Sequence, residues 1–185
     1  CAAAMRPHVR AGARLLAQFR LDDDDAVSAR FTRRIREDLA PVRGLLDRRR
    51  RVVLDYGKGI VLSWQDGLLS AEARYARQWT PGLVLVTRPG DESWILDYDH
   101  SRLWWYQQVL SWTDEIIWVR GRHAGNDSHV PPAGRDRIEM PLARLDRILE
   151  RNFGVDQGAL GRRLLELDEM GADRAGPDPE GQEGT

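Results

Sequence analysis

Hydrophobic positions repeat with a helical period in the first fifty residues of the chain. Apolar residues recur every three or four positions from Val9 to Phe19 and again from Val27 to Leu39. Residues at this spacing share one face of a helix, so the pattern predicts two amphipathic helices. The run from Asp22 to Asp25 is expected to begin the second helix, because carboxylates suit the positive end of a helix dipole. Pro41 predicts a break before a short third helix from Val42 to Leu46.

From Val52 onward the pattern changes to strand-like runs of apolar residues, several of which alternate with polar ones. Turn-forming residues such as Asp66 and Gly67, or Pro89 and Gly90, separate these runs. Strands joined by short turns pair antiparallel, so we expect a β-meander of about six to eight strands that can curl into a partial barrel. The expected strands are 52–54, 60–64, 69–75, 83–87, 94–98, 115–120 and 137–140.

Residues 102–112 are compatible with two structures. Trp105 and Trp112 are spaced as on a helix, whereas Trp104 and Tyr106 alternate as on a strand. We favour the strand, because Trp and Tyr are enriched on pleated surfaces. On a strand the adjacent rings of Trp104 and Trp105 would point to opposite faces of the sheet.

Two amphipathic helices are expected near the end of the chain, at 142–149 and 155–170. From Gly171 the composition turns to Gly, Pro, Asp and Glu, which predicts a disordered acidic tail. The fold class is therefore α+β, with N-terminal helices, an antiparallel β-meander and C-terminal amphipathic helices. The expected divisions are an N-terminal helical region at 5–50, the meander with its closing helices at 51–170, and the tail at 171–185.

Composition limits the function classes. With 185 residues, 42% hydrophobic and 31% charged, the chain can form one full core. Cys1 is the only cysteine, which excludes disulfides and four-cysteine zinc sites. No apolar run approaches the roughly 18 residues that a membrane-spanning helix needs. We therefore expect a cytoplasmic protein with no membrane span and no cofactor.

Five of the seven tryptophans lie between Trp94 and Trp118. Each aromatic side chain can bury on the order of 150–250 Å² at low entropic cost, which is typical of interface hot spots. The first hypothesis is therefore a non-enzymatic binding or adaptor protein that contacts a protein partner, or a second copy of itself, through an aromatic sheet face. The expected contact residues are Trp104, Trp105, Tyr106, Trp112 and Trp118, with Arg120 and Arg122 at the rim.

Nucleic-acid binding is a second hypothesis. Lys58 is the only lysine among 28 basic residues, and several arginines cluster in the predicted N-terminal helices. Arginines of this kind neutralise phosphates, although pairing with Glu37 and Asp38 within the helix is an adequate structural explanation. The candidate residues are Arg33, Arg34, Arg36, Arg48, Arg49, Arg50 and Arg51.

A metal-dependent hydrolase or nuclease is the third hypothesis. The polar segment 121–134 holds His123, Asp127 and His129, which are weak candidates for metal ligands because their spacing matches no known ligand pattern. A lysine and carboxylates of the type used by metal-dependent nucleases are also present. These are Lys58, Glu72, Asp97 and Asp99, although their order along the chain differs from that in such nucleases. His100 and Asp99 could instead add ligands to those of the polar segment. No catalytic residue set is legible, so neither a catalytic residue nor a metal ligand is assigned.

Overall fold

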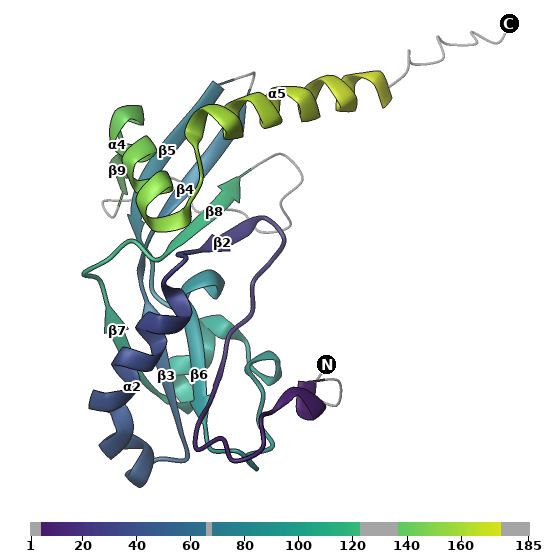
Figure 1. The fold of residues 1–185 in the computed structure, drawn as a ribbon. Helices are drawn as coiled ribbons and strands as arrows, with labels where there is room; N and C mark the ends of the chain where they lie inside the picture. The colour runs from purple at the N-terminus through teal and green to yellow at the C-terminus, as the bar shows by residue number, and fades with distance from the viewer. Residues whose placement is uncertain (1–4, 66–67, 123–136, 175–185) are drawn as a thin grey trace, which may run out of the picture.

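The computed structural model describes residues 5–65, 68–122 and 137–174. They form a mixed α+β structure with two sheets, one in the lower and one in the upper half of Figure 1. The α+β class is confirmed, but the two sheets do not close into a barrel. The first sheet has the strand order β1 (Leu16–Gln18), β6 (Leu83–Thr87), β3 (Arg51–Tyr56) and β7 (Gln108–Trp112).

The second sheet follows directly from the first, because β3 passes through Gly57 into β4. In this sheet β4 and β5 form the expected antiparallel hairpin. The strand order is β2 (Asp25–Val27), β8 (Trp118–Arg122), β4 (Lys58–Gln65), β5 (Leu68–Tyr75) and β9 (Arg137–Glu139).

Both sheets are mixed, so the prediction of a purely antiparallel meander is wrong. β7 pairs in parallel with β3, and β8 pairs in parallel with β4. Parallel neighbours need a long connection between them. Here the chain from β3 to β7 runs through β4, β5 and β6, and the chain from β4 to β8 runs through β5, β6 and β7. The sequence pattern located the longer strands β3 to β6 but did not show which strands pair.

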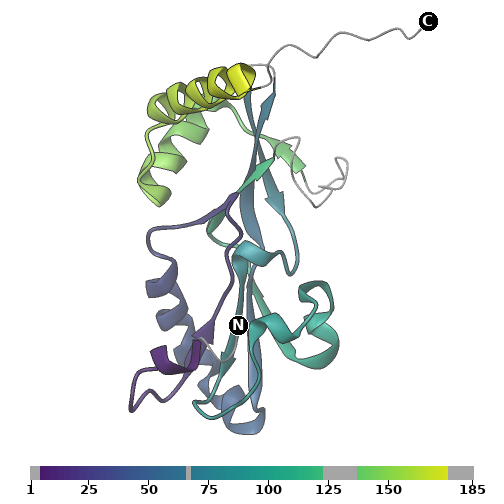
Figure 2. The same ribbon diagram turned by 90° about the vertical axis from the view of Figure 1, so that its right-hand side faces the viewer.

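Helix α2 (Phe31–Arg48) covers one face of the first sheet, and the β6–β7 segment covers the other (Figure 2). Val52 and Leu54 of β3 pack with α2, while Val53 packs with Leu103 on the opposite side. Burial on both faces explains why β3 and β6 are almost continuously apolar.

The helices expected in the first fifty residues are only partly confirmed. The second and third form one helix, because α2 continues through Pro41. An internal proline costs a helix about 3 kcal/mol, and burial of the apolar stripe that includes Phe31, Ile35 and Val42 offsets this cost.

The helix expected from Val9 to Phe19 is wrong. This segment contains β1, which adds to the edge of β6, after a short 3-10 helix η1 (Arg6–His8). Gln18 is buried and bonds through its side chain to Ser93 and to the backbone N–H of Ile95. These contacts with distant residues override the local helical spacing.

The strand expected at 94–98 is also wrong. The structure has 3-10 helix η3 (Ile95–Asp97) there, followed by 3-10 helix η4 (His100–Arg102) and helix α3 (Leu103–Tyr106). Residues 102–112 therefore contain both predicted structures in succession, the helical turn α3 and then strand β7. Trp104 and Trp105 lie on the helical turn, so they do not point to opposite faces of a sheet.

Trp118 fills the junction of the two sheets. Its side chain is fully buried, and its Nε1 donates to the carbonyl of Tyr56 at 2.8 Å. Its ring lies 5.4 Å from that of Trp79 and directly against the backbone of Gly59, where a β-carbon would collide with it. The ring needs a glycine on the neighbouring strand to fit.

The C-terminal helices are confirmed. Helix α4 (Leu142–Ile148) continues into one π-helical turn, η5 (Leu149–Phe153), and Gly154 ends it with a φ of 68°. Leu145 and Leu149 pack on the second sheet. Helix α5 (Gln157–Arg174) runs past the predicted start of the tail at Gly171, and residues 175–185 lie outside the described part. None of the described helices is long and apolar enough to cross a membrane.

Candidate functional site

A run of four carboxylates lies where the chain crosses from the first sheet to the second. We call Asp22–Asp25 the acidic turn. It connects β1 to β2, and it is closed by a hydrogen bond from the backbone N–H of Asp25 to the carbonyl of Asp22 at 3.2 Å. The backbone N–H of Gly121 donates to the carbonyl of Asp24 at 2.7 Å. A β-carbon on Gly121 would lie 2.9 Å from that oxygen, so glycine permits this close approach.

Asp25 is the most unusual residue of the acidic turn. It is 9% exposed, and neither carboxylate oxygen has a hydrogen-bond partner among the described residues. Burial raises its pKa to about 7, and Asp24 and Asp22 add to this rise while Arg120 opposes it. Burying a carboxylate without a partner is costly, and such groups are concentrated at functional sites.

Two arginines flank the acidic turn. Arg20 Nη2 donates to Thr80 Oγ1 at 3.3 Å, and its Nε lies 3.8 Å from Asp22 Oδ1. Arg120 stands opposite Asp25 in the β2–β8 pairing, and its guanidinium lies 5.3 Å from the centre of the Trp79 ring. Both guanidinium groups are therefore oriented by neighbouring side chains.

We call the acidic turn together with Arg20 and Arg120 the charged cluster. A cleft of about 590 Å³ lies beside it. His100 on its wall has a pKa below the usual value of 6.5, first because it is half-buried and then because Arg20 is near; Arg120 adds to the effect, while Asp99 and Asp22 oppose it. The imidazole is therefore mostly neutral at pH 7 and can accept a proton. Trp79 links the cleft to the charged cluster, because it lines the cleft and its ring centre lies 5.3 Å from the Arg120 guanidinium. The cleft is lined by Arg77, Gln78, Trp79, His100, Ser101 and Trp104.

Gln78 forms a strained part of the cleft wall. Its φ is 57°, a left-handed conformation that is unfavourable for a residue other than glycine. Its backbone N–H donates to Asp55 Oδ1 at 2.9 Å, and Ser111 Oγ donates to the other carboxylate oxygen of Asp55. Its side-chain oxygen accepts from the backbone N–H of Trp104 at 3.1 Å. Backbone strain held by such contacts is typical of functional sites.

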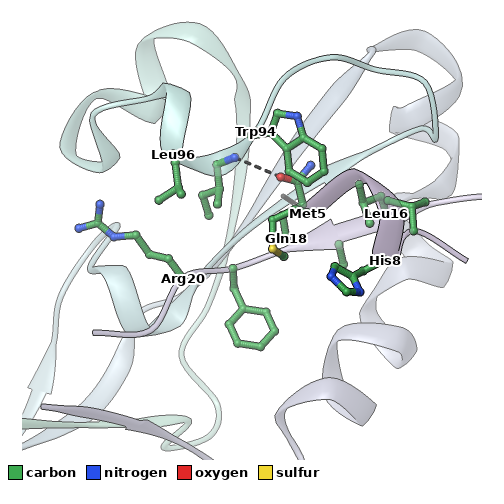
Figure 3. Close-up of a pocket in the computed structure, with 11 residues that line it drawn as sticks. Met5, His8, Leu16, Gln18, Arg20, Trp94 and Leu96 are labelled. Carbon is green, nitrogen blue, oxygen red and sulfur yellow. Dashed lines mark hydrogen bonds between the residues drawn. The ribbon is translucent and has the colours of Figure 1, made fainter. Parts of the chain in front are cut away.

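A second cavity, of about 490 Å³, lies between the N-terminal segment and η3 (Figure 3). Its walls are mostly apolar and include Met5, Leu16 and Trp94. Gln18 is bonded to the backbone of Ile95 at its floor, as the dashed line marks. Arg20 borders both this cavity and the acidic turn. No carboxylate lines it among the described residues, so it lacks the chemistry found at the acidic turn.

The predicted aromatic contact residues separate into two groups. Trp104, Trp105 and Tyr106 are exposed, at 57%, 73% and 58%. Trp112 is half-buried and stacks on Tyr56, with the ring centres 5.7 Å apart. Trp118 is core, so its expected role at a surface contact is wrong. Of the two expected rim residues, Arg120 lies in the charged cluster and Arg122 is exposed at the end of β8.

Three of the seven arginines considered for nucleic-acid binding form ion pairs with other described residues. Arg34 bonds to Asp38 at 2.7 Å and to Asp114 at 2.8 Å, and Arg51 bonds to Asp91. The expected pairing of Arg33 with Glu37 within the helix is confirmed at 3.8 Å. The remaining members of the set, Arg36, Arg48, Arg49 and Arg50, are exposed on or just after α2.

The residues considered for metal binding that the structure describes do not assemble into a site. His123, Asp127 and His129 lie outside the described residues. Asp97 and Asp99 accept hydrogen bonds from the backbone at the starts of η3 and η4, while Glu72 pairs with Arg74 at 3.1 Å. Within the described part of the chain, no three metal-ligating side chains converge.

Comparison with known protein families shows which family the chain belongs to. Residues 1–135 match the model of a family described as putative rhamnosyl transferase. The chain belongs to this family. No curated protein and no solved structure matches it. The rhamnosyl transferase family is one of glycosyltransferases, which are enzymes, so the hypothesis of a non-enzymatic adaptor protein is wrong. The nucleic-acid-binding and the hydrolase or nuclease alternatives are also wrong, because the family is one of enzymes that transfer a sugar.

The region matched by the rhamnosyl transferase family contains the whole charged cluster and the cleft, and ends before β9. Sequence reasoning missed the acidic turn as a site because it was interpreted as a helix start. Helix α2 in fact begins after Arg30 and has no side-chain cap. The number of carboxylates could have indicated a site, because one carboxylate is enough to cap a helix and this turn has four in a row.

Proposed function

We propose that this chain transfers a rhamnosyl group from an activated donor to a hydroxyl group of an acceptor, at the acidic turn and the adjoining cleft. Membership of the rhamnosyl transferase family supports the reaction class. The observation that carries the location is the buried carboxylate of Asp25, unpartnered among the described residues and flanked by Arg20 and Arg120. A group this costly to bury is expected to be satisfied by a bound ligand.

The charges suit a donor with a phosphate leaving group. Arg20 and Arg120 supply fixed guanidinium groups, which bind phosphate oxygens well. Carboxylates beside a phosphate would repel it unless a cation lies between them. Mg²⁺ is commonly held by one or two carboxylates together with substrate phosphates, and Asp22 and Asp25 are the residues that would hold it here. Such a cation neutralises charge on the departing phosphate.

His100 is the residue best suited to activate the acceptor. In the proposed single displacement, the acceptor oxygen forms a bond to the anomeric carbon while the bond from that carbon to the phosphate oxygen breaks. The electron pair of the broken bond leaves with the phosphate, and the acceptor proton passes to the neutral imidazole of His100. The oxocarbenium-like transition state carries positive charge, which nearby carboxylates stabilise.

Asp25→Asn tests the location of the donor site. We expect binding of a nucleoside diphosphate rhamnose donor in the presence of Mg²⁺ to weaken and transfer to fall by about 10²-fold or more, a loss typical of removing one electrostatic group from a site. The melting temperature should stay the same or rise, because the variant no longer buries an unpaired charge. Isothermal titration, product analysis and thermal unfolding measure these effects.

Asp146→Asn, on the exposed surface of α4, is the matched control and should leave donor binding and transfer unchanged. Full transfer by Asp25→Asn, or a wild-type chain that binds no nucleoside diphosphate sugar with Mg²⁺ present, would show that the acidic turn is not the donor site.

His100→Gln tests the proton acceptor. An uncharged side chain of similar polarity cannot take up the acceptor proton, so kcat should fall by about 10²- to 10⁴-fold while donor affinity is retained. Steady-state kinetics with parallel donor titration separate the two effects. A variant that loses donor affinity and keeps kcat would assign His100 to binding.

A further inference from the structure

Three large aromatic side chains stand exposed at the edge of the cleft. We call Trp104, Trp105 and Tyr106 the aromatic ledge. Trp104 lines the cleft itself, and its ring meets that of Trp105 edge to face, with centres 5.6 Å apart. Exposed apolar side chains that cluster in this way mark binding surfaces.

The ledge is held in a fixed orientation. Leu103, which precedes it, is fully buried in the core beneath the first sheet. The Trp104 backbone N–H bonds to Gln78, and its indole Nε1 donates to the carbonyl of Ser101 at 3.1 Å. Because the indole N–H of Trp104 is already hydrogen-bonded, a ligand can contact this side chain only through the faces of its ring. A ligand therefore loses little energy in ordering this surface.

The size of the ledge disfavours a protein partner. Each large aromatic side chain can bury about 150–250 Å², and three of them that are already partly covered reach less than the roughly 800 Å² per partner of a stable protein interface. The side chains next to the ledge are charged: Asp99 and Arg102 are both more than half exposed. A small ligand fits this area better than a protein surface does.

The cleft adds polar groups to the flat aromatic faces. Gln78, Ser101 and His100 lie on its wall beside Trp104. A pyranose ring has the complementary form, with one face of C–H groups and a rim of hydroxyl groups. Aromatic walls with a few placed polar groups are the usual composition of a small-ligand site.

We infer that the acceptor of this enzyme is a saccharide, whose pyranose ring stacks on the aromatic ledge and presents a hydroxyl group toward His100. This inference rests on the proposed function, because it identifies the acceptor of the same site. It places the acceptor at the ledge and the donor at the acidic turn, on two sides of the imidazole.

The test is saccharide binding by the full chain in the absence of donor. Tryptophan fluorescence and isothermal titration with methyl rhamnoside, methyl glucoside, methyl galactoside and a set of trisaccharides should show saturable binding. Trp104→Ala and Trp105→Ala should weaken it at least tenfold, whereas Trp105→Phe, which keeps a ring, should weaken it less. In transfer assays the alanine variants should raise the acceptor KM and leave donor affinity unchanged.

Leu142→Ala is the control, because this leucine is also exposed but lies on α4. It should bind saccharide as the wild type does, and circular dichroism should show all variants folded. If the chain binds and turns over donor but binds none of these saccharides, or if Trp104→Ala and Trp105→Ala bind them normally, the inference is wrong and the proposed function stands. Self-association that is abolished by the same two substitutions would also overturn it. If the wild-type chain binds no donor, the proposed function itself is refuted.

Discussion

The buried carboxylate of Asp55 holds the wall of the cleft in place although it does not line the cleft. It is 1% exposed, and its two oxygens accept from the backbone of Gln78 and from Ser111. Gln78 in turn bonds to Trp104. A single side chain on β3 therefore supports both the strained turn and the first ring of the aromatic ledge.

Asp55→Ala is expected to lower stability and transfer together. It leaves two donors without their acceptor, which costs about 1–3 kcal/mol for each one that stays buried, and it releases the strained turn at Gln78. Urea unfolding and transfer kinetics measure the two effects. Ser111→Ala removes only one of these bonds and should have the smaller effect on both; equal effects would show that Gln78 does not depend on Asp55.

The residues of the site also show how far single positions can be read from sequence. Trp104, Trp105 and Tyr106 are exposed, as a contact surface requires, and their role in binding stays a prediction. Trp118 belongs to the same aromatic-rich stretch but is fully buried. Its burial depends on contacts with Gly59 and Tyr56, which lie in other strands. Asp25 differs from its neighbours through its burial against β8, where it pairs with Arg120, which is far away along the chain. Sequence spacing contains no information about either contact.

Among the described helices and strands, the long continuous patterns were predictable, whereas of the short strands β9 was expected and β1 and β2 were not. The runs that became β4, β5 and β6 each alternate or stay apolar over five or more residues, so the local pattern and the tertiary contacts agree. Three-residue strands such as β1 and β2 have too few positions for a period to show. The acidic turn lies between those two strands, which is why its site was missed.

The β4 strand depends on the absence of a side chain at Gly59. Gly59→Ala should destabilise the chain by about 1–3 kcal/mol, because the added methyl group must displace the ring of Trp118. Gly44→Ala is the matched control: Gly44 lies in α2 with nothing within 4 Å of the added carbon, and alanine should stabilise a helix by about 0.5–1 kcal/mol. Chemical denaturation measures both. Similar free energies of unfolding for the two variants would contradict the packing at Trp118.

Helix α2 is fastened to the loop between β7 and β8 by Arg34 and Asp114. The two side chains form a pair of hydrogen bonds at 2.8 and 3.2 Å. The hydrogen bond from Arg34 lowers the pKa of Asp114 below its usual 3.8, although partial burial opposes this. A carboxyl group with a lowered pKa in the folded state stabilises that state above its unfolded pKa, and this contribution is lost as the pH falls through the folded value.

Asp114→Asn should therefore unfold at a lower melting temperature than the wild type at pH 7, and the difference should shrink as the pH is lowered below about 4. Thermal unfolding measured from about pH 2.5 to about pH 7 covers more than one pH unit on each side of the usual carboxyl pKa and measures the effect. Asp146→Asn removes a carboxylate at an exposed position of α4 and should follow the wild type throughout. A difference that is constant with pH would show that the ionised pair with Arg34 is not its cause.

For the whole molecule, the connections between the sheets matter more than either sheet alone. β3 continues into β4, the acidic turn joins β1 to β2, and Trp118 of the second sheet bonds to Tyr56 of the first. The two cores therefore share residues at one junction, and the proposed site lies beside that junction. We expect the sheets to unfold as a single cooperative unit.

Trp118→Phe tests this coupling. The smaller ring leaves a gap at the junction and the Tyr56 carbonyl without its donor, so the variant should lose about 1–3 kcal/mol of stability. If the sheets unfold together, hydrogen exchange at the slowest amides of β3 and β6 should accelerate by the same factor as at those of β4 and β5. Acceleration confined to β4 and β5 would show two separate units. In that case the acidic turn, which spans both sheets, would depend on ligand binding to hold its two ends together.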